Sequence, residues 1–248
     1  MKISIIIATF NAGKTLQDCL NSITPQLSSD VELLIIDGGS KDKTLEIIEK
    51  NKQYISYIVS ERDKGIYDAW NKGIKAAKGD WVMFIGADDV LLSGAVDEYL
   101  KVINSTLDVT TYDYICAHNE YVDMNGRLLK ILGEEPTWSG MRRTMVAAHV
   151  ASLHSRKEIF ETIGGYNLDF KICADYELLL RKKQSLKVLF IDAHIARMKM
   201  GGMSFSTKAI AEVYKIRKLH HSVSSLSNAL LFLRDWIAYK MFIIRKNI

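Results

Sequence analysis

The chain has 248 residues and a formal net charge of +4 at pH 7, with 48% hydrophobic and 25% charged residues. These values are ordinary for a globular protein and allow one domain with an appendage and a substantial core. The basic residues are scattered or lie within apolar helical stretches, which argues against an extended nucleic-acid-binding face.

Cys19, Cys116 and Cys173 are far apart in the sequence and show no CxxC spacing. We therefore expect reduced thiols in a cytoplasmic protein, and no zinc site. The first residues run directly into a strand-like segment, which predicts that the chain has no signal peptide. No stretch approaches the roughly 18 consecutive apolar residues of a membrane-spanning helix, so we expect no transmembrane segment.

The first 119 residues alternate between strand-like and helix-like segments. Short apolar runs predict strands at 3–9, 31–37, 55–60, 81–85 and 114–117. Apolar residues at helical spacing predict helices at 15–23, 43–50, 68–77 and 93–104. This alternation indicates an α/β fold with a mostly parallel sheet and helices on both faces.

Three polar loops follow predicted strands. The first two span residues 9–13 and 37–40 and contain glycine, and the third carries the pair Asp88-Asp89 after the strand at 81–85. Because the carboxyl ends of parallel strands meet at one edge of a sheet, we expect all three loops on one rim. That rim is where α/β sheets bind their ligands.

The pair Asp88-Asp89 is the strongest single indication of chemistry in the sequence. Two carboxylates beside a buried strand need cations, and hard oxygen ligands at that position suit Mg²⁺ or Mn²⁺ holding a diphosphate. The alternative is that Asp89 is the N-cap of a helix beginning near Leu91 or Ser93, because Asp is a favoured capping residue.

The second half of the chain is less regular. A hairpin is predicted at 121–132, turning at Asn125-Gly126, followed by a loop with a short helix up to residue 148. Short helices are predicted at 157–163 and 175–183, and a strand at 188–191. The chain from residue 206 onward is helical in pattern, which divides the protein into a domain of residues 1–205 and a helical C-terminal extension of residues 206–248.

Four motifs in this order resemble glycosyltransferase family 2, with the GT-A nucleotide-sugar fold. They are SIIIATFN at 4–11, ELLIIDGGSKDKT at 32–44, ERDKGIYDAWNKGI at 61–74 and GDWVMFIGADD at 79–89. The motif at 61–74 resembles the bacterial branch that builds capsule, exopolysaccharide and O-antigen repeat units.

The resemblance implies roles for individual residues. Thr9 and Asn11 would lie against the nucleotide, Asp37 would accept a hydrogen bond from the base, and Lys64 would reach the diphosphate or the base. Asp88 and Asp89 fall at the acidic metal and ribose motif, where members of the family often have a third Asp in place of Gly86.

The acceptor side is implied in the same way. Asp175 matches the general base of inverting members, although Ala174 stands where many relatives have Glu. His149 matches a position that lines the acceptor site, and the loop at 201–204 resembles one that closes over the diphosphate. Taken alone, Asp175 could equally be a helix N-cap, and His149 a partly buried structural histidine.

These roles predict an inverting, metal-dependent sugar transfer. The donor would be a nucleotide diphosphate sugar, for which the resemblance implies UDP. The acceptor would be a glycan or a polyprenyl-diphosphate-linked glycan. The alternatives are a sugar-phosphate nucleotidyltransferase and a non-catalytic nucleotide-sugar-binding or scaffold protein. The apolar, basic segment 226–248 either contacts the inner face of the cell membrane, or packs on the catalytic domain or on a second subunit of a homo-oligomer.

Overall fold

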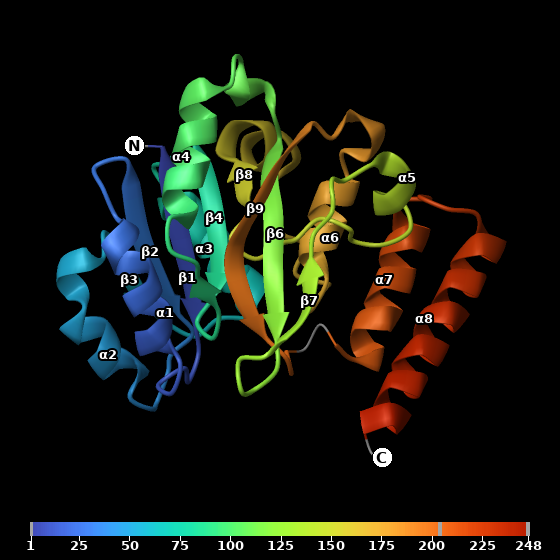
Figure 1. The fold of residues 1–248 in the computed structure, drawn as a ribbon, viewed down its shortest axis with the longest axis horizontal. Helices are drawn as coiled ribbons and strands as arrows, with labels where there is room; N and C mark the ends of the chain where they lie inside the picture. The colour runs from blue at the N-terminus through green and yellow to red at the C-terminus, as the bar shows by residue number, and fades with distance from the viewer. Residues whose placement is uncertain (1, 203–204, 247–248) are drawn as a thin grey trace.

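The computed structural model describes residues 2–202 and 205–246 and is built around one large sheet (Figure 1). Within the described residues the strand order is β3-β2-β1-β4-β8-β6-β9-β5, and β7 pairs with β6. The strands are β1 (Ile3–Thr9), β2 (Val31–Asp37), β3 (Tyr57–Ser60), β4 (Trp81–Gly86), β5 (Val90–Leu91), β6 (Tyr114–Val122), β7 (Leu128–Leu132), β8 (Leu153–Ser155) and β9 (Val188–Lys199).

Strands β3, β2, β1 and β4 pair in parallel, so the predicted parallel half of the sheet is confirmed. Strand β8 lies antiparallel between β4 and β6, and β9 pairs in parallel with β6. As a result β6 and β9 run in the direction of β4, while β5 and β7 run against it. The short strands β5 and β8 are absent from the sequence-based prediction.

Helices cover both faces of the sheet, as predicted. They are α1 (Leu16–Ile23), α2 (Thr44–Lys50), α3 (Ile66–Ala76), α4 (Ala95–Ser105), the short α5 (Trp138–Met141), α6 (Ala174–Leu180), α7 (Thr207–Leu219) and α8 (Ser225–Lys246). The buried apolar residues of α1, α2 and α4 belong to one apolar cluster, and those of α3, α6 and α7 to another. The two clusters correspond to the two faces, because alternate residues of β1, Ile5 and Ile6 for example, belong to different ones.

Helix α3 lies close against the sheet because Gly73 faces β1. A Cβ atom at this position would lie 2.6 Å from Cγ2 of Ile6. Only glycine allows the helix to approach this closely. The approach fixes the position of the first turn of α3, which borders the site described below.

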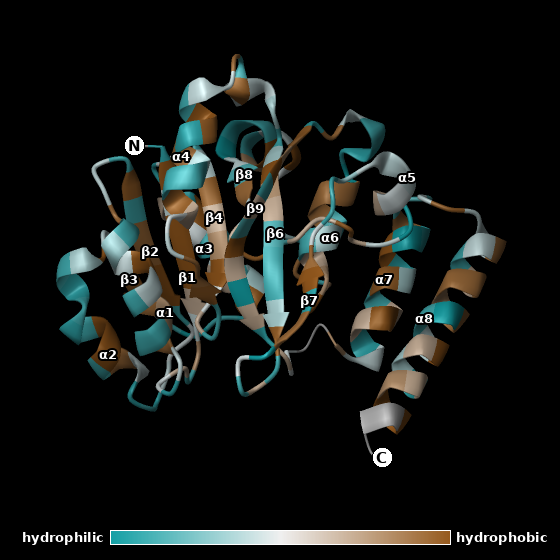
Figure 2. Ribbon diagram, viewed as in Figure 1, coloured by the Kyte–Doolittle hydropathy of each residue, from teal (hydrophilic) through white to brown (hydrophobic). Residues whose placement is uncertain are grey.

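The C-terminal extension forms a pair of neighbouring helices, α7 and α8, at one end of the molecule (Figure 1). Helix α7 packs on the α6 side of the sheet and buries Ile216 and Arg217 completely. Helix α8 contacts α7 and carries apolar residues along its length (Figure 2). None of the helices in the described residues has the length and apolar character needed to cross a membrane. The boundary between 205 and 206 stays a prediction.

Candidate active site

The ends of β1, β2 and β4 meet at one rim of the sheet. The parallel register pairs Thr9 with Asp37 and Ala8 with Gly86. The loops that follow these three strands are therefore neighbours, as the sequence pattern predicts. Asp88 and Asp89 lie just beyond Gly86 on the same rim.

Asp37 is the centre of a hydrogen-bond network at this rim. Its Oδ1 accepts from the hydroxyls of Thr9 at 3.0 Å and Ser40 at 2.5 Å, and its Oδ2 accepts from the Ser60 hydroxyl at 2.6 Å. The backbone N–H groups of Gly39 and Ser40 also donate to Oδ2, at 3.0 and 2.9 Å. Burial acts to raise the pKa of Asp37, but the donors Ser40, Ser60 and Thr9 outweigh it and hold the pKa below its ordinary value.

Asp37 therefore orders the first two loops of the rim, and its side chain is fully buried. Both of its oxygens already accept hydrogen bonds from the protein. Its direct contact with a nucleobase, and that of Thr9, stay predictions.

Asn11 also joins the first two loops. Its N–H donates to the Ser40 hydroxyl at 2.8 Å, and its side-chain Oδ1 accepts from the N–H of Lys41 at 3.0 Å. Its φ of +49° is the left-handed conformation that Asn tolerates better than most residues. Lys64 is exposed, and its N–H donates to a carboxylate oxygen of Asp68 at 2.9 Å. No contact brings the Lys64 side chain to the other candidate residues within the described chain.

Sequence reasoning missed a feature at the mouth of these loops. Phe10 follows β1 and is 65% exposed. Gly38 lies beside it, because a Cβ atom on Gly38 would be 3.3 Å from the Phe10 ring and 2.6 Å from a carboxylate oxygen of Asp63. An exposed aromatic ring next to a carboxylate is a surface on which a planar, hydrogen-bonding ligand can stack. The sequence signal for this feature is Phe10 itself, a large apolar residue inside a polar loop.

Asp88 and Asp89 differ in environment. Asp88 is exposed, whereas Asp89 is 8% exposed and its Oδ2 accepts from the N–H of Gly86 at 3.3 Å. Burial, and secondarily the charge of Asp88, raises the pKa of Asp89 to about 8. The helix-capping alternative for Asp89 is wrong, since β5 follows it and α4 begins only after the N-cap Gly94.

The space next to Gly86 is too small for the third Asp that many family members have at this position. A Cβ atom on Gly86 would lie 2.8 Å from carboxylate oxygens of both Asp88 and Asp89. The two acidic side chains therefore fold back over the space that a side chain at position 86 would occupy. Such close contacts require the neighbours to shift.

The acidic pair fits a divalent cation that completes its coordination with other ligands. Among the residues that the structure describes, no His, Cys, Asp or Glu side chains form a group of three that could hold a metal ion. Mg²⁺ characteristically uses one or two carboxylates together with substrate phosphates and water. The two neighbouring carboxylates of Asp88 and Asp89, whose negative charges repel each other, match that pattern.

Asp175 lies in the first turn of α6, and the N-cap of that helix is Cys173. The N-cap alternative for Asp175 is therefore wrong. Its Oδ1 accepts from the hydroxyl of Tyr67 at 3.0 Å, and its Oδ2 lies 3.9 Å from Nδ1 of His149. The side chain is 14% exposed, so most of it is enclosed by protein and a small part stays accessible.

One cavity of about 620 Å³ joins the acidic pair to Asp175. Asp88, Asp89, His149 and Asp175 all line it. Its wall also includes Gly201 and Gly202, while Met203 and Ser204 of the predicted closing loop lie outside the described residues. Thr9, Asn11, Asp37 and Lys64 are not part of the wall, so the rim network lies beside the cavity.

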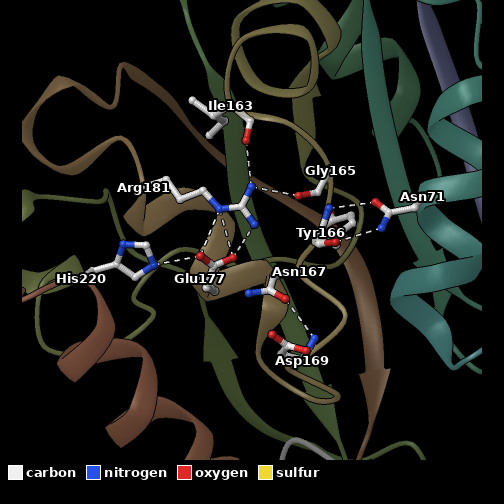
Figure 3. Close-up of polar contacts among 9 residues, drawn as sticks. All are labelled: Asn71, Ile163, Gly165, Tyr166, Asn167, Asp169, Glu177, Arg181 and His220. Carbon is white, nitrogen blue, oxygen red and sulfur yellow. Dashed lines mark hydrogen bonds and ion pairs between the residues drawn. The ribbon is translucent and has the colours of Figure 1, made fainter.

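Helix α6 is tied to α7 through Glu177, two residues after Asp175 (Figure 3). Oε1 of Glu177 lies 2.8 Å from Nε2 of His220, and Arg181 donates from Nε to the same carboxylate at 3.0 Å. Arg181 Nη1 also donates to the carbonyls of Ile163 and Gly165, both at 2.9 Å. Burial alone would raise the pKa of Glu177, but the bonds from His220 and Arg181 hold it below its ordinary value.

A second contact joins α7 to the segment just before α6. The carboxylate of Glu212 accepts from the backbone N–H groups of Lys171, Ile172 and Cys173 at 2.8, 2.9 and 2.9 Å. These N–H groups lie at the positive end of the α6 dipole, where a carboxylate is favourable. The C-terminal extension thus holds both ends of the short segment that carries Asp175.

Comparison with known proteins supports the family that the sequence motifs resemble. Residues 4–152 match the sequence profile of Glycosyl transferase family 2. A PGL/p-HBAD biosynthesis glycosyltransferase of Mycobacterium bovis is 33% identical over 186 residues, which are 72% of this chain and 68% of that protein. A chondroitin synthase of Escherichia coli is 28% identical over 188 residues, which are 72% of this chain and 26% of that protein.

Solved structures share the fold. S. aureus TarS in complex with UDP-GlcNAc matches with a TM-score of 0.70 and 18% identity over 96% of this chain and 73% of that chain. The chain covers 43% of the longer TarS structure. The mannosyltransferase PcManGT from Pyrobaculum calidifontis, in complex with GDP-Man and Mn²⁺, matches with a TM-score of 0.65 and 12% identity over 97% of this chain and 75% of that chain.

These matches confirm the predicted GT-A-like fold and the predicted resemblance. Because the profile covers more than half of the chain and the mycobacterial relative is 33% identical across two thirds of both proteins, the chain belongs to glycosyl transferase family 2.

Proposed function

We propose that the protein transfers a sugar from a nucleotide diphosphate sugar to an acceptor hydroxyl, with inversion at the anomeric carbon. The observation that carries the proposal is the cavity that Asp88 and Asp89 share with Asp175. A donor whose diphosphate lies at the acidic pair would present its anomeric carbon toward Asp175. An acceptor hydroxyl hydrogen-bonded to Asp175 would then attack from the side opposite the leaving group.

Asp175 would take the proton of the acceptor hydroxyl as the bond to the sugar forms. General-base catalysis of this kind contributes typically 10²–10⁴-fold to a rate. The fourth carboxylate of the described cavity wall, Asp235, is paired with Arg217 at 3.2 Å. Asp175 is thus the one acceptor-side carboxylate of the described wall that no Lys or Arg pairs with, which favours one direct displacement over a double displacement through a covalent intermediate.

At the donor end, Asp88 and Asp89 would hold a Mg²⁺ or Mn²⁺ ion, which supplies charge compensation for the departing diphosphate. The raised pKa of Asp89 supports this assignment, because a carboxylate buried next to another one is stabilised by a cation. Mn²⁺ is present in the complex of the structural relative PcManGT.

The nucleotide would be uridine diphosphate, with its base on the Phe10 side of the rim and Thr9, Asn11 and Asp37 shaping the loops around it. TarS binds UDP and UDP-GlcNAc, which supports this choice. Lys64 is exposed in the segment that follows β3, and its side chain would reach the base or the diphosphate.

Replacing Asp175 tests the proposal. Asp175→Asn keeps the shape of the side chain but removes the base, so nucleotide release from UDP-, GDP- or dTDP-sugars should fall by about 10²–10⁴-fold. Donor binding, followed as a thermal shift with Mn²⁺, should stay near wild type. Asp192→Asn is the control, because that side chain is 96% exposed. Turnover that is unchanged in Asp175→Asn would rule out the base assignment.

We also propose that the extension brings the enzyme to an anionic membrane surface, where a polyprenyl-diphosphate-linked glycan would be the acceptor. Residues 206–248 contain eight Lys or Arg and two acidic residues. Both acidic side chains are engaged internally, Glu212 at the start of α6 and Asp235 with Arg217. The exposed charge of the extension is therefore almost entirely positive, which suits anionic lipids and disfavours pairing with a second copy.

The outer side of α8 supplies the apolar contact. Leu226, Leu230, Leu233 and Ile237 follow one another at helical spacing and are 72, 59, 51 and 45% exposed. Leu230→Glu/Leu233→Glu should abolish co-sedimentation with phosphatidylglycerol vesicles, with little effect on folding. Leu107→Glu is the matched control, since Leu107 is 86% exposed elsewhere on the molecule. Equal vesicle binding by both variants would contradict the proposal.

A further inference from the structure

Tyr67 is the single hydroxyl that contacts Asp175 in the described chain, and sequence reasoning gave it no role. It lies in the first turn of α3 and is 5% exposed. Its phenol oxygen is 2.7 Å from the carbonyl oxygen of Ile172 and 3.0 Å from Oδ1 of Asp175. The one phenolic proton is thus shared between a backbone carbonyl and the carboxylate.

The ring of Tyr67 has little freedom to move. Its centroid is 5.4 Å from that of Trp70 in an edge-to-face contact, and 5.2 Å from that of Tyr166. Helix α3 is itself held against the sheet at Gly73. The hydroxyl therefore reaches Asp175 from a rigid helix that packs on the same face of the sheet as α6.

This contact distinguishes the two oxygens of Asp175. Oδ1 is engaged by Tyr67, whereas Oδ2 lies on the His149 side, 3.9 Å from Nδ1. Both Asp175 and His149 line the cavity. An acceptor hydroxyl would accordingly meet Oδ2, in an orientation that Tyr67 has already selected.

Tyr67 remains a donor throughout the physiological range. Burial first, and then the negative charge of Asp175, raises the pKa of its phenol far above the ordinary value. The other titratable groups facing Asp175 are Tyr166, Cys173 and His149. The pKa values of Tyr166 and Cys173 are also raised, chiefly by burial, so these two groups stay neutral.

We propose that Tyr67 is a positioning residue for the reaction, which holds the carboxylate of Asp175 so that Oδ2 can receive the proton of the acceptor hydroxyl. The inference rests on the proposed function, because it takes Asp175 to be the base. Tyr67 itself neither gains nor loses a proton in the reaction.

Tyr67→Phe removes only the hydroxyl. Hydrogen bonds to charged groups contribute on the order of 1.5–3 kcal/mol, which corresponds to about a 10–150-fold loss of kcat. The donor KM should stay within about twofold, because the diphosphate lies at the other end of the cavity.

Tyr114→Phe is the matched control. Tyr114 is also completely buried, and its hydroxyl donates to the carbonyl of Ala148 at 2.7 Å. This variant loses a comparable buried hydrogen bond without touching Asp175. Its kcat, normalised to folded protein, should match that of the wild type, whatever its effect on stability.

The assay is nucleotide release from whichever UDP-, GDP- or dTDP-sugar the wild type turns over fastest, with kcat normalised to folded protein. In the Asp175→Asn background, adding Tyr67→Phe should cause no further loss. If Asp175→Asn is inactive but Tyr67→Phe behaves like Tyr114→Phe, the positioning role is wrong and the base assignment stands. If Asp175→Asn is fully active, the proposed function itself fails.

Discussion

Replacing Asp89 should stabilise the metal-free protein while impairing its donor site. Asp89 is 8% exposed, and burial together with Asp88 raises its pKa from 3.8 to about 8. Because the folded-state pKa lies above the unfolded one, the contribution of this carboxyl to stability is fully present below pH 3.8. It is then lost progressively as the pH rises to about 8.

The size of the effect follows from that difference. At pH 7 the solution pH lies about 3 units above the unfolded-state pKa, and each unit is worth about 1.4 kcal/mol. The ionisable carboxyl of Asp89 therefore lowers the free energy of unfolding by on the order of 4 kcal/mol. Asn at position 89 cannot ionise but can still accept from the N–H of Gly86. Asp89→Asn should therefore be more stable than the wild type at pH 7–9 and nearly equal to it at pH 4.

The measurement is urea unfolding in excess chelator across this pH range, paired with the thermal shift that Mn²⁺ and UDP produce. Asp89→Asn should raise the midpoint at pH 8 and lose most of that shift. Asp88→Asn should raise the midpoint less, because Asp88 is exposed and contributes the smaller part of the pKa shift. A less stable Asp89→Asn protein at pH 8 that still responds to Mn²⁺ like the wild type would refute the reasoning.

Two further predictions concern groups outside the acidic pair. Burial lowers the pKa of His154 from 6.5 to about 3, so its contribution to stability is present above pH 6.5 and is lost as the pH falls toward 3. The wild type should lose on the order of 2 kcal/mol from this group between pH 7 and 5, and denaturant titrations of His154→Phe should show a smaller acid loss. Glu212→Gln cannot satisfy all three N–H groups before α6, so it should lower the free energy of unfolding by about 1–3 kcal/mol and reduce kcat. The exposed Glu46→Gln is its control, and equal stability and turnover of the two variants would contradict the role of Glu212.

The elements that the sequence predicted well are those with local signals. Continuous apolar runs bounded by polar residues define β1 and β2, whose bounds agree with the predicted segments. Strand β8 has three residues and depends on pairing with β4 and β6, so it has no local signature. The two residues of β5 pair only with distant β9 and escaped prediction for the same reason.

The residues of the candidate site also differ in how well the sequence predicts them. Positions at the ends of parallel strands could be predicted from topology, which is why Asp88 and Asp89 were found. The hydrogen-bond partners of polar side chains could not be predicted in this way. The carboxylate of Asp37, for example, is enclosed by hydrogen-bond donors of the protein itself. Tyr67 lies 108 positions before Asp175, and only the tertiary fold brings its hydroxyl to the carboxylate.

The distribution of these contacts explains how the Asp175 side of the candidate site is built. The family profile ends at residue 152, before α6 and Asp175. Beyond that point the segment that carries Asp175 is held by α3 through Tyr67 and by α7 through Glu212 and His220. The C-terminal extension is therefore a structural support of the proposed base as well as the proposed membrane-binding surface. A chain ending at residue 205 should retain the rim loops and lose order around Asp175, because both ends of that segment would lose their partners in and next to α7.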